Sequence, residues 1–309
     1  MDSDALETFL TIDRLRSFSR AARVLNRTQP AISHRIRMLE RELGAPVFER
    51  VSGGIVLSQA GRAFLPHAER AFAAMQDAAS AVRELRSENA GPVTLAAVGT
   101  LAGPALTSVL KRFVESHPAV ELTLRTARSA EVSELVRLGE ATIGLRYERD
   151  GSPDLRCDEL GAEPLLVVCS SDHPLAGRSV ATLRKLRDER WIAFPEVPGQ
   201  REISASHVFG LFLAHGLGEV RWTPVDSLTA QKRLVEAGFG LALMTESSVV
   251  EERAAGTIGV IRVKDLPPGM PVFLVTREGG FLSAAARRLC ALLRTEYAAG
   301  WNAKGRRRR

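Results

Sequence analysis

The 309-residue chain is poor in cysteine. Its three cysteines, Cys157, Cys169 and Cys290, are odd in number, far apart, and form neither a CxxC motif nor a metal-ligand spacing. We therefore expect no disulfide framework and no metal site. Cys169 follows the apolar residues 165–168 and is expected to be a small core residue, with a redox pair of Cys157 and Cys169 as the alternative.

Long apolar runs are also missing. No segment approaches the roughly 20 apolar residues that would span a bilayer. The first residues, Met1-Asp2-Ser3-Asp4, are acidic and lack the basic and apolar regions of a leader peptide. We therefore expect a cytoplasmic protein without membrane contact.

Signatures of catalysis are absent as well. The sequence contains no GxSxG motif, P-loop, dinucleotide fingerprint or metal spacing, and its histidines are scattered. An enzyme built on the later part of the chain stays an alternative, but we expect no catalytic residues and no cofactor.

Basic charge is concentrated at the two ends. The net charge is only +6, yet residues 14–62 contain ten arginines and three glutamates, a local net charge of +7. Residues 91–303 are close to neutral, with 24 Lys and Arg against 25 Asp and Glu. The end of the chain adds Lys304 and Arg306–Arg309, which we expect to be a disordered, solubilising part of a basic tail at 301–309. The N-terminal block is where a polyanion would bind.

A helix-turn-helix is predicted within residues 17–37. Ser17 is placed to cap a short helix in which Ala21 and Ala22 allow close helix contact. Asn26-Arg27 forms a turn, Thr28 caps the next helix, and Pro30 falls in its first turn, where a missing N–H costs little. Ile32, Ile36, Leu39 and Leu43 recur at spacings of 4, 3 and 4, so we expect them to form the buried stripe of this second helix.

The opposite face of that helix suits entry into a DNA major groove. Gln29 can pair with adenine, Ser33 can contact a base or phosphate, and Arg37 can hold guanine or the backbone. Arg35 and Arg41 are expected to contact phosphates, and Arg50 lies in a predicted hairpin at 47–57 that would form a wing. The predicted DNA-binding set is Ser17, Thr28, Gln29, Pro30, Ser33, His34, Arg35, Arg37, Arg41 and Arg50.

A long helix is predicted at 61–87. Leu65, Ala68, Phe72, Met75, Ala79 and Val82 recur with a period of 3.5 residues, which favours pairing with another helix. Packing on its own domain is the alternative. Asn89, Gly91 and Pro92 mark a hinge after it.

Strands and helices alternate from Val93 onward, which is typical of α/β domains with mainly parallel sheets. Predicted strands lie at 93–98, 120–126, 143–147, 165–170, 241–245 and 272–276. Predicted helices lie at 101–115, 131–138, 208–215, 228–236 and 284–297.

The N-terminal residues resemble the LysR-type transcriptional regulators. The matching positions run from Phe9 through 17–22, 29–33 and 47–50 to 57–61 at fixed spacing. Val47 and Ser58 depart from the residues most common there, leucine and threonine.

The resemblance implies an α/β protein with an N-terminal, mostly α-helical, winged helix-turn-helix at 1–58 and a dimerisation linker helix at 59–88. After a hinge at 89–92, it implies a two-lobed, periplasmic-binding-protein-like (type II) effector domain at 93–300. Lobe I would comprise 93–162 and 269–300, and lobe II 163–268. The implied partners are promoter DNA, RNA polymerase, a second or further copies of the chain as a homodimer or homotetramer, and a small-molecule effector.

Candidate effector contacts lie at strand ends and helix starts of this domain. Thr100 and Ser129 follow strands, although plain helix capping is as good a reading of Ser129. Arg146 ends an apolar strand, and Arg201 precedes a helix. Both charges favour an organic acid as the effector. Thr245 stands where family members commonly have proline.

Two further function classes compete with a ligand-responsive regulator. A solute-binding protein would need a leader and no DNA-reading helix, and an architectural DNA binder would need no cleft.

Overall fold

The computed structural model describes residues 1–52, 54–85, 91–194, 203–267 and 269–305, with side chains except at 83–85, 203–207 and 298–305. The chain divides into two compact units. The first is Met1–Arg86 with Arg137–Gly139, and the second is Ser87–Val136 with Glu140–Arg309. None of the described helices is long and apolar enough to cross a membrane.

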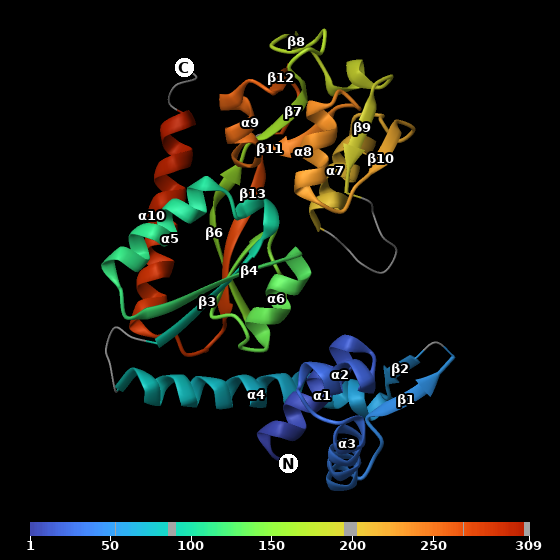
Figure 1. Cartoon of the computed structure of the whole chain (residues 1–309), viewed down its shortest axis with the longest axis vertical. Coiled ribbons are helices and arrows are strands. Elements are labelled where there is room, and N and C mark those ends of the chain that lie inside the picture. The colour runs from blue at the N-terminus through green and yellow to red at the C-terminus, as the bar shows by residue number, and fades with distance from the viewer. Residues whose placement is uncertain (53, 86–90, 195–202, 268, 306–309) are drawn as a thin grey trace. The chain divides into compact units, whose positions relative to one another are not determined.

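The first unit is a three-helix core followed by a hairpin and a long helix (Figure 1). Its elements are α1 (Ser3–Leu15), α2 (Phe18–Val24), α3 (Gln29–Leu43), β1 (Phe48–Val51), β2 (Gly54–Leu57) and α4 (Gln59–Leu85). Phe9 is fully buried and joins these parts, because its ring lies 5.3 Å from that of Phe48 and 5.1 Å from that of Phe64. Such aromatic packing fixes the hairpin and the start of α4 against α1.

The buried stripe of α3 is shorter than its periodicity predicts. Ile32, Ile36 and Leu39 are buried, as expected, but Leu43 is 39% exposed. The helix ends at Leu43, and Gly44 continues the chain with φ of +72°. Leu43 therefore reaches the end of α3 beyond the packed core, and the prediction for it was wrong.

The period-3.5 face of α4 divides into two halves. Ala68 is buried, and Leu65 and Phe72 pack against the core of the first unit. Met75 and Val82 are 46% and 61% exposed, and Ala79 is exposed too. Packing on its own domain therefore accounts for the first half of this face and leaves the second half open.

Lobe I of the second unit contains a five-stranded sheet in the order β4-β3-β5-β13-β6. Its strands are β3 (Gly91–Val98), β4 (Val120–Ala127), β5 (Ile143–Tyr147), β6 (Leu155–Glu163) and β13 (Met270–Arg277). β3 is parallel to β4 and β5, whereas β13 is antiparallel to β5 and β6. The sheet is mixed, which corrects the expectation of mainly parallel sheets. β3 begins at Gly91, so half of the predicted hinge at 89–92 is strand and the rest lies outside the described residues.

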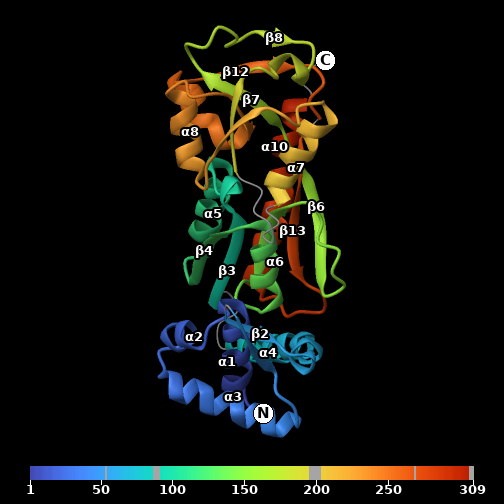
Figure 2. The same ribbon diagram turned by 90° about the vertical axis from the view of Figure 1, so that its right-hand side faces the viewer.

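Three helices cover this sheet (Figure 2). They are α5 (Pro104–Ser116), α6 (Ser129–Arg137) and α10 (Ala284–Gly305). α5 and α10 contact each other, and Arg112 on α5 pairs with Glu296 on α10 at 2.7 Å. α6 packs over Gly144 of β5, where an added Cβ would lie 2.9 Å from a Val132 methyl group. α10 continues through 301–305, so this part of the predicted basic tail is helical; Arg306–Arg309 lie outside the described residues.

Lobe II contains a four-stranded sheet in the order β11-β7-β12-β8 and a parallel pair, β10-β9. A bridge between Trp191 and Leu241 links the two. The strands are β7 (Leu165–Ser170), β8 (Ser179–Val180), β9 (Arg190–Ala193), β10 (Arg221–Pro224), β11 (Ala242–Thr245) and β12 (Ile258–Val263). The helical segments are η2 (Leu183–Leu186), α7 (Ile203–Ala214), α8 (Leu228–Glu236), η3 (Glu246–Val249) and α9 (Val250–Ala255). The sequence did not predict β6, β8, β9, β10 or β12.

The two lobes are joined by two chain crossings that touch each other. β6 ends at Glu163 and β7 begins at Leu165, while β13 returns to lobe I at Met270. Gly269 has φ of +153°, and a Cβ there would lie 2.3 Å from the Glu163 carbonyl oxygen. Glycine is needed at 269 because only it permits both this backbone conformation and this close approach.

Candidate functional sites

The start of α3 has the predicted capping. Thr28 Oγ1 accepts the Ala31 N–H at 3.4 Å, and Pro30 occupies the first turn. Asn26 makes the turn before it with φ of +51°, a conformation that asparagine tolerates better than most residues. Ser17 is half-buried and caps α2 by accepting the Arg20 N–H at 3.3 Å.

The N-terminal half of α3 presents a polar face to solvent. Gln29 Nε2 lies 3.3 Å from Ser33 Oγ, and Arg37 Nε donates to the Ser33 carbonyl at 3.3 Å. These contacts place the side chains of Gln29, Ser33 and Arg37 on one face of the helix, although Arg37 bonds the backbone of Ser33 rather than its side chain. Of the predicted set, Thr28, Gln29, Pro30, His34, Arg37, Arg41 and Arg50 are exposed, and Ser17, Ser33 and Arg35 are half-buried.

Arg35 has an intramolecular partner that the sequence did not reveal. Its Nη1 lies 2.7 Å from Asp4 Oδ2, so it joins α3 to α1. This contact competes with the phosphate contact predicted for Arg35, whereas no ion pair involving Arg41 is found among the described residues. Of the arginines in the predicted DNA-binding set, Arg37, Arg41 and Arg50 remain exposed and available to a polyanion.

The hairpin of the wing packs closely against the start of the linker helix α4 near Val47 and Gly61. Arg50 lies opposite Ile55 in the β1–β2 hairpin. Ser58 Oγ accepts the Gly61 N–H at 2.9 Å, which caps the start of α4. A Cβ on Gly61 would lie 2.1 Å from the Val47 carbonyl oxygen, so only glycine fits there. The direction in which α4 leaves the winged helix is therefore fixed by packing.

The second unit contains a pocket of about 510 Å³, part of it open to solvent. Its walls come from both lobes and are mainly apolar. They are formed by Thr100, Tyr147, Leu165, Ala193, Phe194, Val208, Leu228, Gln231, Leu243, Met244, Thr245, Ser248 and Met270.

A chain of hydrogen bonds closes the polar end of this pocket. Thr100 Oγ1 donates to the Tyr147 hydroxyl at 3.0 Å, and that hydroxyl donates to Glu163 Oε2 at 2.7 Å. Ser247 Oγ donates to the other carboxylate oxygen, Glu163 Oε1. Because Ser247 belongs to η3, the chain links lobe I to lobe II beside the crossings. Burial, together with the negative charge of Glu163, raises the pKa of Tyr147 well above its ordinary value, so the phenol stays protonated.

The predicted effector residues are divided between this pocket and other places. Thr100 and Thr245 line it. Thr245 lies near the Tyr147 hydroxyl, but its buried Oγ1 forms no hydrogen bond of ordinary geometry with any described group. Ser129 is the first residue of α6 and fully buried, and its Oγ has no described partner and does not line the pocket. Arg201 lies outside the described residues.

Arg146 does not face the pocket. It is 2% exposed, and its Nη1 lies 2.6 Å from Asp150 Oδ2 and also donates to Ser133 Oγ. Burial would raise the pKa of Asp150, but hydrogen bonds from Ser152 and Ser133 and the Arg146 charge lower it overall. The charge of the guanidinium is therefore balanced by Asp150 inside lobe I, which corrects the expectation that Arg146 faces either the cleft or solvent.

Sequence reasoning missed Tyr147, Glu163, Gln231, Ser247 and Ser248. Glu163-Pro164 stands between two strand-forming runs at the lobe crossing, and an acidic residue in that place was the one available signal. Gln231 is 4% exposed and donates through Nε2 to the Ile192 carbonyl at 2.8 Å. Gln231 is buried because of how α8 packs in the folded chain, which the sequence around it did not indicate.

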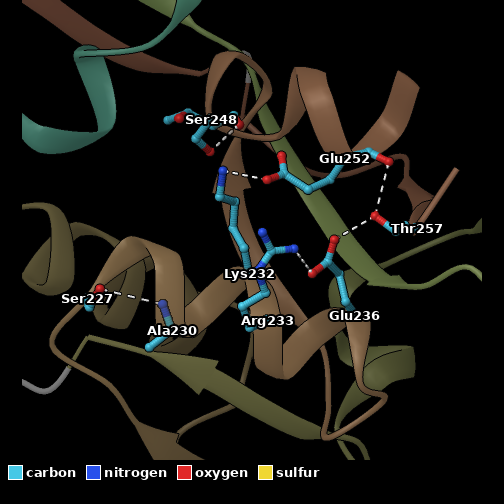
Figure 3. Close-up of polar contacts among 9 residues, drawn as sticks. Ser227, Ala230, Lys232, Arg233, Glu236, Ser248, Glu252 and Thr257 are labelled. Carbon is cyan, nitrogen blue, oxygen red and sulfur yellow. Dashed lines mark hydrogen bonds and ion pairs between the residues drawn. The ribbon is translucent and has the colours of Figure 1, made fainter. Parts of the chain in front are cut away.

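An ionic cluster joins α8 to α9 (Figure 3). Lys232 Nζ of α8 lies 2.6 Å from Glu252 Oε1 of α9, with side-chain exposures of 18% and 9%. Glu252 Oε2 is buried and has no hydrogen-bond partner among the described groups. The pair ties α8, which carries Leu228 and Gln231, to the segment that carries Ser248.

All three cysteines are buried and free. Burial raises the pKa of Cys157, and raises those of Cys169 and Cys290 to about 11. Cys157 lies in the lobe I sheet and Cys169 in the lobe II sheet. Neither thiol has the lowered pKa typical of a redox-active cysteine.

Family models match both units. Residues 3–62 match the bacterial regulatory helix-turn-helix protein, lysR family, and residues 86–298 match the LysR substrate binding domain. The chain belongs to the LysR family. It is a DNA-binding transcriptional regulator with an effector-binding domain, and members of this family are not enzymes.

Relatives match the LysR-type chain over nearly its whole length. The HTH-type transcriptional regulator CbbR of Rhodospirillum rubrum is 30% identical over 291 residues, 94% of each chain. Full-length CbnR complexed with its target DNA has a TM-score of 0.61 at 24% identity, covering 96% of this chain and all of that one. The CcmR regulatory domain of Synechocystis PCC6803, solved in complex with 2-PG, has a TM-score of 0.60 at 22% identity, covering 66% of this chain and 96% of that one. The two structures show the shared fold.

Proposed function

We propose that this regulator reads promoter sequence with the N-terminal half of α3 and holds the flanking backbone with its wing. The observation that carries the proposal is the exposed, mutually bonded group Gln29, Ser33 and Arg37 on a capped helix. Short polar groups followed by a cation match the donors and acceptors of base edges. CbnR, which shares the fold, was solved with its target DNA. Binding to the chromosome would place the protein in the cytoplasm.

The regulator acts as a homodimer, or as a homotetramer built from such dimers, through the open half of α4. Ala79 and the exposed Met75 and Val82 continue a period-3.5 face that their own unit does not cover. A second copy of the helix would bury these side chains. Contact with RNA polymerase is part of the proposal and rests on the resemblance to the family.

A small molecule in the pocket controls promoter binding or activation. The pocket draws its walls from two lobes, is partly open to solvent, and contains the buried Thr245 hydroxyl, which has no hydrogen-bond partner of ordinary geometry among the described groups. An organic acid was the expected effector because of Arg146 and Arg201. The structure pairs Arg146 with Asp150 instead, and Arg201 lies outside the described residues. The CcmR regulatory domain, of the same fold, was solved with the small molecule 2-PG.

Genome-wide mapping of bound DNA would supply the operator, and binding measurements on variants would then test the helix. Gln29→Ala and Ser33→Ala should change the preferred base at one position, at a cost of about 1–3 kcal/mol there. Arg41→Ala should weaken binding evenly across sequences and reduce its salt dependence. Arg178→Ala, an exposed arginine of the second unit, is the matched control and should leave binding unchanged. Unaltered promoter binding by all three α3 variants would refute the proposal.

A further inference from the structure

At the polar end of the pocket, the hydroxyl groups of Thr100 and Tyr147 both donate their protons to other groups of the protein. A carboxylate accepts hydrogen bonds but donates none, so Tyr147 must donate to Glu163, and Thr100 must in turn donate to Tyr147. Each hydroxyl has one proton. Toward the pocket, Thr100 and Tyr147 therefore offer only oxygen lone pairs.

Ser248 of lobe II repeats this pattern. Its Oγ donates to the Thr245 carbonyl at 2.8 Å, so it too is left with lone pairs. Gln231 has one amide hydrogen bonded to the Ile192 carbonyl, which leaves its own side-chain oxygen as an acceptor and one hydrogen as a donor. Thr245 Oγ1 is the one hydroxyl of the described pocket lining without a hydrogen bond of ordinary geometry, and the Tyr147 oxygen lies near it.

The charge beside the pocket is negative. Glu163 is 3% exposed and lies directly behind Tyr147. The described part of the lining contains no lysine, arginine or histidine. A ligand carboxylate would lose its hydration, meet the hydroxyl oxygens of Thr100, Tyr147 and Ser248 whose protons are donated elsewhere, and lie close to a like charge, each of which raises its free energy.

We propose that the effector is a neutral or cationic molecule with a largely apolar body and a hydroxyl or ammonium group. This group donates hydrogen bonds to the oxygens of Thr100, Tyr147 and Ser248. The apolar body packs against Leu228, Leu243, Met244 and Met270. The inference rests on the proposed function, namely that the pocket holds the effector, and it replaces the expectation of an organic acid.

A set of probes with one body and three head groups tests the ligand class. Cyclohexylmethanol, cyclohexylmethylammonium and cyclohexanecarboxylate are titrated into the full-length protein at pH 7, with binding followed by calorimetry and thermal shift. The carboxylate should bind about tenfold more weakly than the tighter of the other two. Equal or tighter binding of the carboxylate overturns the inference, and so does the absence of saturable binding by all three. DNA binding is measured separately, so the proposed regulator function can stand when the ligand class fails.

The variant Glu163→Gln tests whether the Glu163 charge sets the preference for the ammonium probe. Glutamine keeps the size of the side chain and still accepts from Tyr147, but it removes the charge. The affinity for the ammonium probe should fall about tenfold, while that for the alcohol changes less than about threefold. Glu121→Gln, an exposed glutamate on β4, is the matched control and should change neither. An unchanged ratio between the two probes in Glu163→Gln overturns the role of this charge.

Thr100→Val serves as a second variant if Glu163→Gln does not fold. It removes one pocket acceptor at a half-buried position without touching the carboxylate. The alcohol should then bind about fivefold more weakly, and an unchanged affinity counts against the inference.

Discussion

Loss of the Lys232–Glu252 ion pair should strongly destabilise the effector domain. Lys232→Met leaves the Glu252 carboxylate buried with neither oxygen paired, since Oε2 already lacks a partner among the described groups. Removing one partner of a buried pair costs about 3–5 kcal/mol, because the remaining charge keeps its desolvation penalty. For a domain of this size, about 1 kcal/mol shifts the unfolding temperature by about 2–4 °C. The transition of the second unit should therefore fall by about 10 °C.

A double-mutant cycle isolates the pair. Lys232→Met with Glu252→Leu removes both charges and should recover most of the lost stability, since apolar replacement of a buried pair is often neutral. The control cycle uses Lys111→Met and Glu115→Leu on α5, a pair 3.9 Å apart with exposures of 77% and 62%. Solvent screens that pair, so its cycle should show almost no coupling.

Scanning calorimetry of the full-length variants provides the measurement. The reasoning is refuted if Lys232→Met lowers the transition by less than about 2 °C, or if both cycles show the same coupling. Because α8 and η3 both contribute residues to the pocket lining, Lys232→Met should also weaken binding of the alcohol probe.

Three further outcomes follow from other contacts. Gly61→Ala should destabilise the winged helix, because the added Cβ would lie 2.1 Å from the Val47 carbonyl oxygen. The change should lower the melting temperature measured by circular dichroism. An unchanged melting temperature would mean that α4 can move away from Val47 without cost. Asp150 has a lowered folded-state pKa, so its stabilising contribution is present above the unfolded pKa of about 4 and is lost as pH falls further. The stability gap between wild type and Asp150→Asn should therefore narrow from pH 7 to pH 3 in denaturant titrations, and a constant gap contradicts the assignment. Val82→Glu should raise the dimer dissociation constant measured by analytical ultracentrifugation, because it places a charge on the period-3.5 face of α4. Ala74→Glu is the control at an exposed position off that face and should leave the constant unchanged. Equal effects of the two variants would mean that α4 pairs through another face.

The sequence by itself determined the DNA-reading unit. Capping by Ser17 and Thr28, the turn at Asn26 and the stripe at Ile32, Ile36 and Leu39 all depend on neighbours within a few positions. Interactions between such neighbours are encoded in spacing alone. The same holds for α8 and for the apolar strands β5 and β7, whose predicted limits match those observed.

Only the tertiary structure decided the partners of charged and polar groups. Arg146 ends an apolar strand, but whether it faces a cleft or a carboxylate depends on the loop that brings Asp150 to 2.6 Å. The mixed sheets, the short strands of lobe II and the exposure of Leu43 likewise depend on segments distant in sequence. Glu163 shows the point most clearly, because its hydrogen bonds come from Tyr147 and Ser247, 16 and 84 residues away. Burial makes such contacts strong, and burial is a property of the folded chain rather than of any segment of it.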